Sequence, residues 1–564
     1  MYKLIYKSRL LLAFVYLPVM IASAQDVAEL KKQKPFSVSG TIGIGVGTYG
    51  VSGIPSRARS FSYLFSGSPV VSLYGISFPV GIVVSDQQRG FTQPFNQYGA
   101  SPRYKWLTVH GGWRSLTFSP FTLGGAVFLG GGVEMNPGKL RLGFVYGRLN
   151  KAVEADTSKS TNYFTQIPAY KRTGYAAKIG YGTEDNHVDF IYLRAKDDSN
   201  SIRRPDASYN ITPAENAVFG VSLKYKLFKH IIIESDVAGS LYTRDQGSDT
   251  FSNELLKDAK LLTKLIKINA SSQALTAGQA ALGYEAKTFN VRLQYKRVDP
   301  NFQSMGAYYF ETDVENYTVA PSFFLLQRRL VVSGSLGWQH DNILKDKSFR
   351  SKKTIGNVNI GYNIQPFGVN VQYSNYGISQ DRGLNPIIDT LRVARTNHNI
   401  NTMTRFTFSN ERLSQNIILV ATYQALVDLN KSTAGFSETN SKTANISYQA
   451  GLLKSGINLN AIYSYTVADA AMFHTVIHGP SVGIDKQLWQ SRVNLNTNWS
   501  YQLQTNNNVK AGHFISGTFT GSVRVSKRNA LNATLSYLQS VSEDVTQSPS
   551  FKEFRTNFTY AYTF

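Results

Sequence analysis

Basic residues at alternating positions are the side chains in this sequence most able to act on a solute. A row of cations along one wall of a narrow polar path focuses positive potential and favours the passage of anions. Ten residues fit this description: Arg141, Lys178, Lys224, Lys226, Arg292, Lys296, Arg405, Arg492, Arg524 and Arg555. The alternative is that they pair with acidic residues on the same face and only solvate it; those acids are fewer and include Asp189, Glu234, Glu285 and Asp485.

A second group of basic residues lies in the segment 243–278, which contains the one convincing amphipathic helix. Apolar residues recur there at helical spacing, at Leu255, Ala259, Leu262 and Ile266, and a neighbouring face carries Lys257, Lys260, Lys264 and Lys267. The helix is predicted either to pack its apolar stripe on a rim, or to act as a lid whose lysines meet phosphates or anionic solutes.

Histidines are the remaining candidates for catalysis or metal binding, and no group of them fits either chemistry. His187 lies between Asp185 and Asp189 beside a predicted short turn, where aspartate is common for conformational reasons. His474 and His478 are four residues apart, but threonine follows His474 where zinc proteases have a glutamate. The chain has no cysteine, which excludes a thiolate metal site. Because no Ser, Asp or His grouping fits catalysis either, we predict neither an enzyme nor a bound metal or cofactor.

The elements that position these residues are predicted from an alternation of apolar and polar side chains. Between Arg492 and Tyr501, apolar or aromatic residues take every second position, and arginine, asparagine or serine take the others. One face therefore suits lipid and the other suits water. After Ala24 no stretch resembles a transmembrane helix, so any membrane span consists of strands, and in lipid only a closed barrel satisfies every strand edge.

Connections of two lengths separate the predicted strands. From Lys139 onward we count twenty strands, which are joined in pairs by short turns that include 184–186, 228–230, 327–329, 365–367 and 526–528. Longer segments alternate with these turns and include 150–173, 196–216, 243–278, 377–397 and 542–552. Transmembrane barrels have short periplasmic turns and long extracellular loops, so we place the long segments outside the cell.

The region from Phe36 to Glu134 is interrupted by glycine and proline, and its contribution stays open. The candidate strands are Phe36–Thr48, Phe61–Tyr74, Phe78–Val84, Arg103–His110, Trp113–Phe118 and one ending near Glu134. If all belong to the wall, the barrel has about 26 strands; if part of 36–134 forms a plug in the lumen, it has about 22 or 24. The predicted fold of residues 36–564 is an all-β, transmembrane, antiparallel up-and-down β-barrel of about 24–26 strands.

The N-terminus has the layout of a secretory signal. Three basic residues precede an apolar stretch from Leu10 to Ile21, and small residues follow up to Ala24. We predict that residues 1–24 are a cleaved signal peptide and that 25–35 form a short periplasmic segment. The formal charge of +23 then falls by three to +20, and this excess favours anionic partners.

Two short stretches resemble known proteins. Aromatic residues share one face of the last predicted strand, at Phe554, Phe558, Tyr560, Tyr562 and Phe564. This pattern resembles the C-terminal recognition signal of outer-membrane β-barrels, which implies that the barrel assembly machinery reads it during biogenesis. Residues 95–149, with Tyr104-Lys105-Trp106, Phe118-Ser119-Pro120-Phe121 and Glu134 to Lys139, resemble uncharacterised Bacteroidota-type outer-membrane proteins, a resemblance that implies no activity.

These observations favour transport across the outer membrane of a Gram-negative bacterium, through a channel or translocation pore with a basic lumen. A barrel this wide must be occluded by inward loops or by a partner. The alternative is a non-conducting, membrane-anchored component of a multi-protein assembly, or a surface-binding protein. The expected partners are outer-membrane lipid and lipopolysaccharide, and a partner protein or an anionic solute in the lumen; we expect no nucleic acid.

Overall fold

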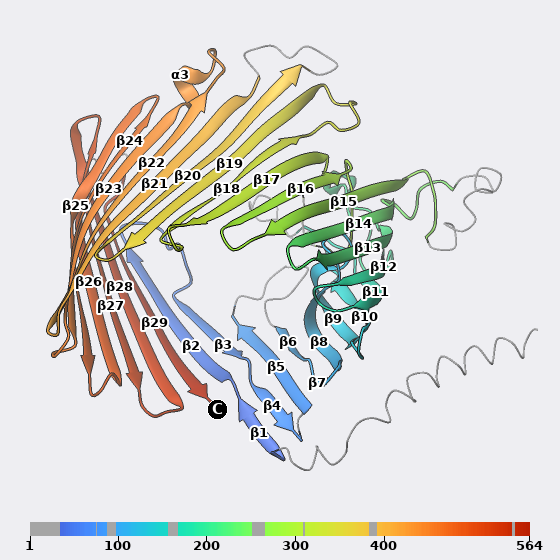
Figure 1. Ribbon diagram of the computed structural model, residues 1–564, viewed down its shortest axis with the longest axis horizontal. Coiled ribbons are helices and arrows are strands. Elements are labelled where there is room, and N and C mark those ends of the chain that lie inside the picture. Colours follow the sequence, from blue (N-terminus) through green and yellow to red (C-terminus); the bar gives the residue numbers. More distant parts are fainter. Residues whose placement is uncertain are drawn as a thin grey trace, which may run out of the picture.

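Antiparallel strands make up nearly all of the regular structure in the computed structural model (Figure 1). The structure describes residues 34–74, 76–86, 97–155, 167–250, 266–307, 311–382, 392–543 and 548–564. The predicted signal peptide, most of the segment 25–35 and the predicted helix as far as Lys264 lie outside these residues. Among the described residues, no helix is long and apolar enough to cross a membrane.

The N-terminal part of the wall consists of short strands. Their bounds are β1 Phe36–Ser39, β2 Thr41–Ser52, β3 Phe61–Gly67, β4 Val70–Leu73, β5 Ile76–Ser85, β6 Gln97–Ala100, β7 Arg103–Tyr104, β8 Leu107–Thr117 and β9 Gly124–Met135. β1 continues the line of β2, and β4 continues that of β3, while β6 and β7 follow one another between β5 and β8. These strands therefore fill six positions of the wall.

Twenty further strands follow in chain order, each paired antiparallel with its neighbours. They are β10 Leu140–Asn150, β11 Arg172–Gly182, β12 His187–Asp197, β13 Glu215–Leu227, β14 Ile231–Thr243, β15 Ser272–Glu285, β16 Phe289–Val298, β17 Val314–Leu325, β18 Leu330–His340, β19 Phe349–Ile364, β20 Phe367–Arg382, β21 Ala394–Ser409, β22 Leu413–Asp428, β23 Thr439–Leu452, β24 Ile457–Ala470, β25 Phe473–Leu488, β26 Val493–Asn506, β27 Val509–Arg524, β28 Asn529–Ser542 and β29 Phe551–Thr563. The short helical turns η1 Ala207–Tyr209 and α3 Ala434–Ser437 lie between strands.

The first and last strands close the ring. β2 pairs with β29 along its whole length, from Thr41 opposite Thr563 to Ser52 opposite Lys552. The result is a closed antiparallel barrel of 26 strands (Figure 1). This is the strand number that the sequence predicts when the whole N-terminal region contributes to the wall.

The route of the chain through the N-terminal region differs from the prediction at one place. The sequence predicts two strands, Arg103–His110 and Trp113–Phe118, but the structure has one continuous strand there, β8, and adds β6 before it. Gly112 stays inside β8 with φ +87°, and a Cβ atom on it would lie 2.5 Å from the carbonyl oxygen of Tyr98 on β6. Because glycine can adopt a positive φ, β8 continues through Gly112 as an irregular strand. The sequence suggests instead that the glycines interrupt it.

Several strands are longer than the alternation predicts. β15 begins at Ser272, so the long segment predicted to reach Gly278 ends at Ser271, and β20 continues past Gly377 to Arg382. β19 to β22, β25 and β27 each have 16 residues, whereas a tilted transmembrane strand needs about 9–11. The predicted periplasmic turns are short in the structure, so the extra length extends on the extracellular side.

Aromatic side chains mark two levels on the outer face. Tyr295, Tyr317 and Trp338 stand beside one another on β16, β17 and β18. Near the other end of the same strands, the rings of Phe289 and Phe323 are 5.0 Å apart. Aromatic girdles of this kind lie at the two interfaces of a bilayer, with exposed apolar residues between them. The barrel with its apolar outer belt therefore belongs in the outer membrane.

Candidate functional site in the barrel lumen

The lumen face is the face opposite the exposed apolar belt. On β12, Phe190 is exposed on the outer face, whereas Asp189 and Leu193 are buried on the inner face. Residues paired across neighbouring strands point to the same side of the sheet. The register therefore identifies the inward and outward positions of every strand in turn. Asp189, for example, stands between Gly180 on β11 and Ser222 on β13.

The ten basic residues predicted for the lumen lie in wall strands, apart from Arg492, which directly precedes β26. Six of them make ion pairs, namely Arg141 with Asp189, Lys178 with Glu134, Lys224 and Arg292 with Glu234, Lys226 with Glu285, and Arg555 with Glu553. Within the described residues, no ion pair involves the other four, Lys296, Arg405, Arg492 and Arg524. Pairing therefore neutralises more than half of these cations.

The most enclosed of these pairs joins β10 to β12. Arg141 donates to both carboxylate oxygens of Asp189, over 2.8 and 3.0 Å, and the Asp189 side chain is only 3% exposed. Lys178 lies on β11 between them, with its ammonium 4.8 Å from the centre of the Phe118 ring and 3.9 Å from Glu134. These charged groups bond the strands to one another and contact the segment that contains Phe118. They therefore add little net positive charge to the lumen.

Three of the four unpaired cations lie at one end of the barrel. Arg405 stands opposite Gly368 near the start of β20, Arg492 precedes β26, and Arg524 ends β27. The long connections, such as 198–214 and 429–438, lie at the opposite end, so this is the periplasmic end. All three side chains are exposed, and Arg405 donates a 3.3 Å hydrogen bond to the side-chain oxygen of Asn363. We name these three residues the periplasmic arginine arc.

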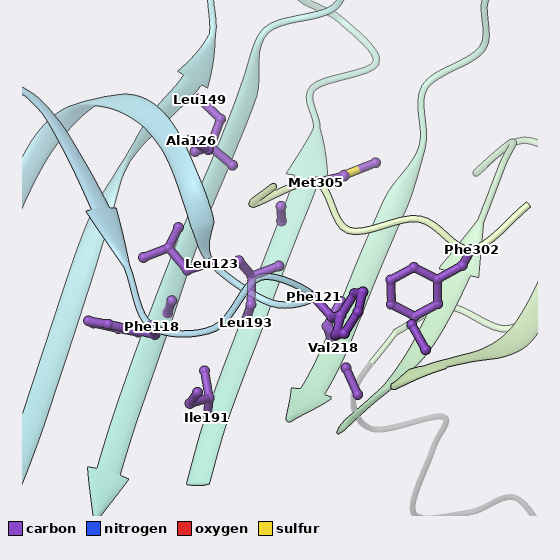
Figure 2. Close-up of a cluster of buried hydrophobic side chains, with 14 of the residues drawn as sticks. Phe118, Phe121, Leu123, Ala126, Leu149, Ile191, Leu193, Val218, Phe302 and Met305 are labelled. Carbon is purple, nitrogen blue, oxygen red and sulfur yellow. The ribbon is translucent and has the colours of Figure 1, made fainter. Parts of the chain in front are cut away.

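The hairpin of β8 and β9 folds into the lumen; the sequence left open whether part of 36–134 does so, but it did not identify this hairpin. The pairing of β9 with β10 ends at Leu129, and the rest of the hairpin leaves the wall. Its tip, 118–123, crosses the inner faces of β10 to β13 (Figure 2). A Cβ atom on Gly220 of β13 would lie 2.4 Å from the methyl group of Thr122, so the tip lies directly against the wall.

A second segment, 299–307 between β16 and β17, also folds inward and contacts the hairpin. The backbone N–H of Gly124 donates a 2.8 Å hydrogen bond to the carbonyl oxygen of Gly306. The hydroxyl of Ser304 donates to the carbonyl oxygen of Thr122 over 2.5 Å, and both residues are buried. The two inward segments therefore hold each other in place.

Apolar side chains from both inward segments and from the wall form one buried cluster. Phe121 and Phe302 meet edge to face with their ring centres 6.3 Å apart, beside Leu193 and Val218 of the wall (Figure 2). Leu123 is 1% exposed. Burying each such side chain stabilises the folded state by about 1.5–3 kcal/mol, so the cluster fixes the inward segments against the wall. On the side of β10 to β16, the lumen is occupied by protein.

The opposite wall presents a different chemistry to the lumen. The inward positions of β19 to β27 are mostly amides and hydroxyls, including Asn357, Asn359, Asn370, Gln372, Asn399, Asn401, Thr422, Gln424, Thr443, Asn445, Asn460, Ser464, Asn498, Ser500, Ser516 and Thr518. Neighbours bond across strands, as Asn370 does with Asn359 at 3.0 Å. Charged residues on this face, such as Lys353 and Asp485, stand near strand ends. We name this surface the amide-rich arc.

A hollow of about 970 Å³ lies where the ring closes, between β2, β3, β5, β28 and β29. Its lining includes Ser62, Thr534, Ser536 and Asn557 on the lumen face. Gly45 and Gly47 of β2 also line the hollow and leave backbone in place of side chains on its floor. We name it the closure hollow.

The histidines considered from sequence contact separate partners in the structure. His187 contacts a backbone carbonyl of its own turn at 3.0 Å, while Asp189 is bound to the arginine described above. His474 is 2.5 Å from the carboxylate of Asp469, and His478 is 2.8 Å from a tyrosine hydroxyl on the neighbouring strand. In the described ranges, no group of three His, Asp or Glu residues is placed to hold a metal ion.

The predicted lid helix is described only at its end. Ile266 is 2% exposed, and the ammonium of Lys267 donates a 3.2 Å hydrogen bond to the carbonyl oxygen of Gln246. The other apolar and lysine positions of this helix lie outside the described residues. Its role as a lid stays a prediction.

The aromatic residues predicted to form an assembly signal belong to β29 and the residue after it. Phe554, Phe558, Tyr560 and Phe564 are exposed, on the face opposite Glu553 and the lumen. The aromatic stripe therefore faces lipid. Its reading by the assembly machinery stays a prediction.

Comparisons with known proteins find similarity in structure only. No protein-family model and no curated protein matches the chain. Among solved structures, the P pilus usher PapC translocation pore matches with a TM-score of 0.39 and 10% identity, covering 93% of this chain and 99% of that chain. The copper transporter OprC matches with a TM-score of 0.38 and 8% identity over 94% of this chain and 81% of that chain. OpdK of Pseudomonas aeruginosa matches with a TM-score of 0.32 and 9% identity over 63% of this chain and 94% of that chain.

These matches are outer-membrane proteins. The sequence resemblance to Bacteroidota-type proteins stays a prediction. The chain is an outer-membrane β-barrel protein.

Proposed function

We propose that the protein is an outer-membrane channel whose lumen is partly filled by its own inward segments. The supporting observation is the contrast between the two sides of the lumen. Barrels of 22 strands already enclose a space that needs a plug, and this one has 26. The β8–β9 hairpin and the segment 299–307 fill the side of β10 to β16, whereas the amide-rich arc keeps its polar side chains at least partly exposed. A hydrated path along the arc follows.

The selectivity of this path depends on the cations that keep a free charge. Ion-paired residues add little net potential, so the basic character predicted for the lumen is concentrated in the unpaired residues. The periplasmic arginine arc places three of these at one mouth, where positive potential raises the local concentration of anions. We expect a modest preference for anions that originates at the periplasmic mouth.

Planar-bilayer recording of the purified protein tests both statements. We expect stable conductance, and a reversal potential in a KCl gradient that indicates anion preference. Changing Arg405, Arg492 and Arg524 together to glutamine should reduce that preference, while Lys454→Gln, in a periplasmic turn outside the arc, should not. A protein that prefers cations would refute the selectivity, and an electrically silent protein that copurifies with specific partners would support the alternative role as an assembly component.

A further inference from the structure

The closure hollow combines many hydrogen-bonding groups with no net charge. Its lining contains Arg555 and Arg59 as cations. The Nε of Arg555 donates to the carboxylate of Glu553 over 2.6 Å, and Arg59 donates to Asp86 over 3.0 Å. Each cation is therefore matched by a carboxylate beside it. The net charge beside the hollow is therefore close to zero.

The guanidinium of Arg555 is held in a fixed position. Its carbon lies 5.1 Å from the centre of the Tyr49 ring, and the Tyr49 hydroxyl donates to the second carboxylate oxygen of Glu553 over 3.1 Å. Glu553 is 8% exposed at its side chain, whereas that of Arg555 is 57% exposed. The remaining N–H groups of this guanidinium are thus presented to the hollow as oriented donors.

The rest of the lining combines neutral donors and acceptors with the apolar side chains of Leu64 and Val83. Ser62, Thr534 and Ser536 contribute hydroxyls, and Asn557 contributes an amide, all at inward positions of their strands. A hydroxyl both donates and accepts, and an amide offers a donor and an acceptor side by side. This combination matches a ligand surface dense in hydroxyl groups. A wholly apolar ligand would leave these groups without partners.

The amide-rich arc extends the same chemistry from the hollow around the wall. β28, which lines the hollow, is followed by β27 and β26, whose inward positions include Ser516, Thr518 and Asn498. Farther along, Tyr376 is 44% exposed at an inward position of β20 and offers an aromatic face. The central part of this surface is free of the ion pairs that occupy β10 to β16. The closure hollow is therefore one end of a hydrogen-bonding surface on which charged side chains are few and, at the hollow, paired.

We propose that the closure hollow binds an uncharged, hydroxyl-rich oligosaccharide, and that the amide-rich arc is the track along which such a chain moves. This inference rests on the proposed channel function and adds a class of substrate to it. Vicinal hydroxyls would pair with amides and serines, and the apolar face of a sugar ring would lie on an aromatic ring.

Current block in planar bilayers tests the proposal, with maltohexaose as the probe and polyethylene glycol of equal hydrodynamic radius as the size control. We expect maltohexaose to interrupt the current saturably and the glycol to do so only weakly. Asn557→Leu and Thr534→Val should each weaken the block about tenfold. Thr404→Val, on the lipid-facing side of β21, should leave it unchanged.

The outcomes separate this inference from the proposed function. Conductance with equal block by both probes would leave the channel standing and overturn the saccharide site. A silent protein that still binds maltohexaose by calorimetry in detergent, and loses binding in Asn557→Leu, would overturn the channel and keep the site. Stronger block by an anionic oligogalacturonate than by maltohexaose would overturn the argument from charge.

Discussion

The Arg141–Asp189 pair shows how inward charges are used in this protein. It bonds β10 to β12 across the intervening strand, and Arg292 reaches Glu234 in the same way across β15. Alternation predicted which residues point inward, because side chains on a strand alternate between two faces. It could not predict the pairing, because the partner of each residue depends on the register between strands that are far apart in sequence.

Removing one member of this buried pair should be far more harmful than removing both. Asp189→Leu leaves the Arg141 guanidinium without its counter-charge, and we expect a loss of about 3–5 kcal/mol in the free energy of unfolding. The double change Arg141→Met with Asp189→Leu should recover most of that loss. Urea unfolding followed by heat-modifiable gel mobility measures both.

An exposed pair provides the control for that experiment. Lys510 and Glu543 are 60% and 48% exposed at their side chains, so Glu543→Gln should leave the free energy of unfolding almost unchanged. Equal losses for Asp189→Leu and Glu543→Gln would contradict the assigned role of burial.

Asp313, in the extracellular segment before β17, should make one loop sensitive to acid. Burial raises the pKa of its carboxyl, but hydrogen bonds from Lys347 and from the backbone N–H groups of Asn342 and Ile343 outweigh this and hold the pKa below its usual range. A carboxyl with a lowered pKa stabilises the folded form above its ordinary pKa of about 3.9, and this contribution is lost as the pH falls through the lowered value.

A spin label measures this effect directly, because the chain has no other cysteine to compete. A label on Leu344→Cys, at an exposed position of the loop, should be restrained at neutral pH and become mobile as the pH falls well below 4. In the Asp313→Asn background it should be mobile at neutral pH as well. A label equally restrained at every pH would contradict the idea that the Asp313 carboxylate holds this loop in place.

At the scale of elements, the inward hairpin shows where sequence reasoning succeeded and where it failed. The twenty strands from β10 to β29 could be predicted because they are regular and alternate cleanly. Phe118 and Phe121 gave an unused signal, because two aromatic residues at the tip of a hairpin need a surface to cover them. Which surface covers them depends on long-range packing, and alternation carries no information about it.

Two adjacent glycines in β8 should differ sharply in their tolerance of a methyl group. Gly112 has φ +87° and would place a Cβ atom 2.5 Å from a carbonyl oxygen, whereas a Cβ atom on Gly111 would have no neighbour within 4 Å. We expect Gly112→Ala to lower stability by roughly 1–3 kcal/mol and Gly111→Ala to have a much smaller effect. The temperature at which heat-modifiable mobility is lost gives the comparison, and equal values would show that the strand relaxes freely.

At the scale of the whole molecule, ring closure depends on the last strand. β29 pairs with β28 on one side and with β2 on the other, and the backbone N–H of Phe564 donates a 3.0 Å hydrogen bond to Gly40. Closure between strands about 500 residues apart could be predicted in principle from the need to satisfy both edges in lipid. The number of strands that the N-terminal region adds to the wall could not be predicted, because its glycines obscure the alternation.

Deleting Phe564 should lower the amount of folded barrel in the outer membrane, because both the closing hydrogen bond and the terminal aromatic group are lost. The measurement is the fraction of heat-modifiable protein in purified outer membranes. Phe436→Ala, at a residue 85% exposed in α3, is the control and should be neutral. Unchanged assembly after the deletion would refute the predicted recognition signal.

The unequal strand lengths give the extracellular opening a slanted rim. A strand of 16 residues spans about 53 Å and one of 10 residues about 33 Å, so β19 to β22 rise well above β16. The high side of the rim is formed by β19 to β22, which also carry part of the amide-rich arc. A large molecule drifting along the cell surface meets that polar sheet before it reaches the depth of the lipid, so its first encounter with the protein takes place outside the membrane.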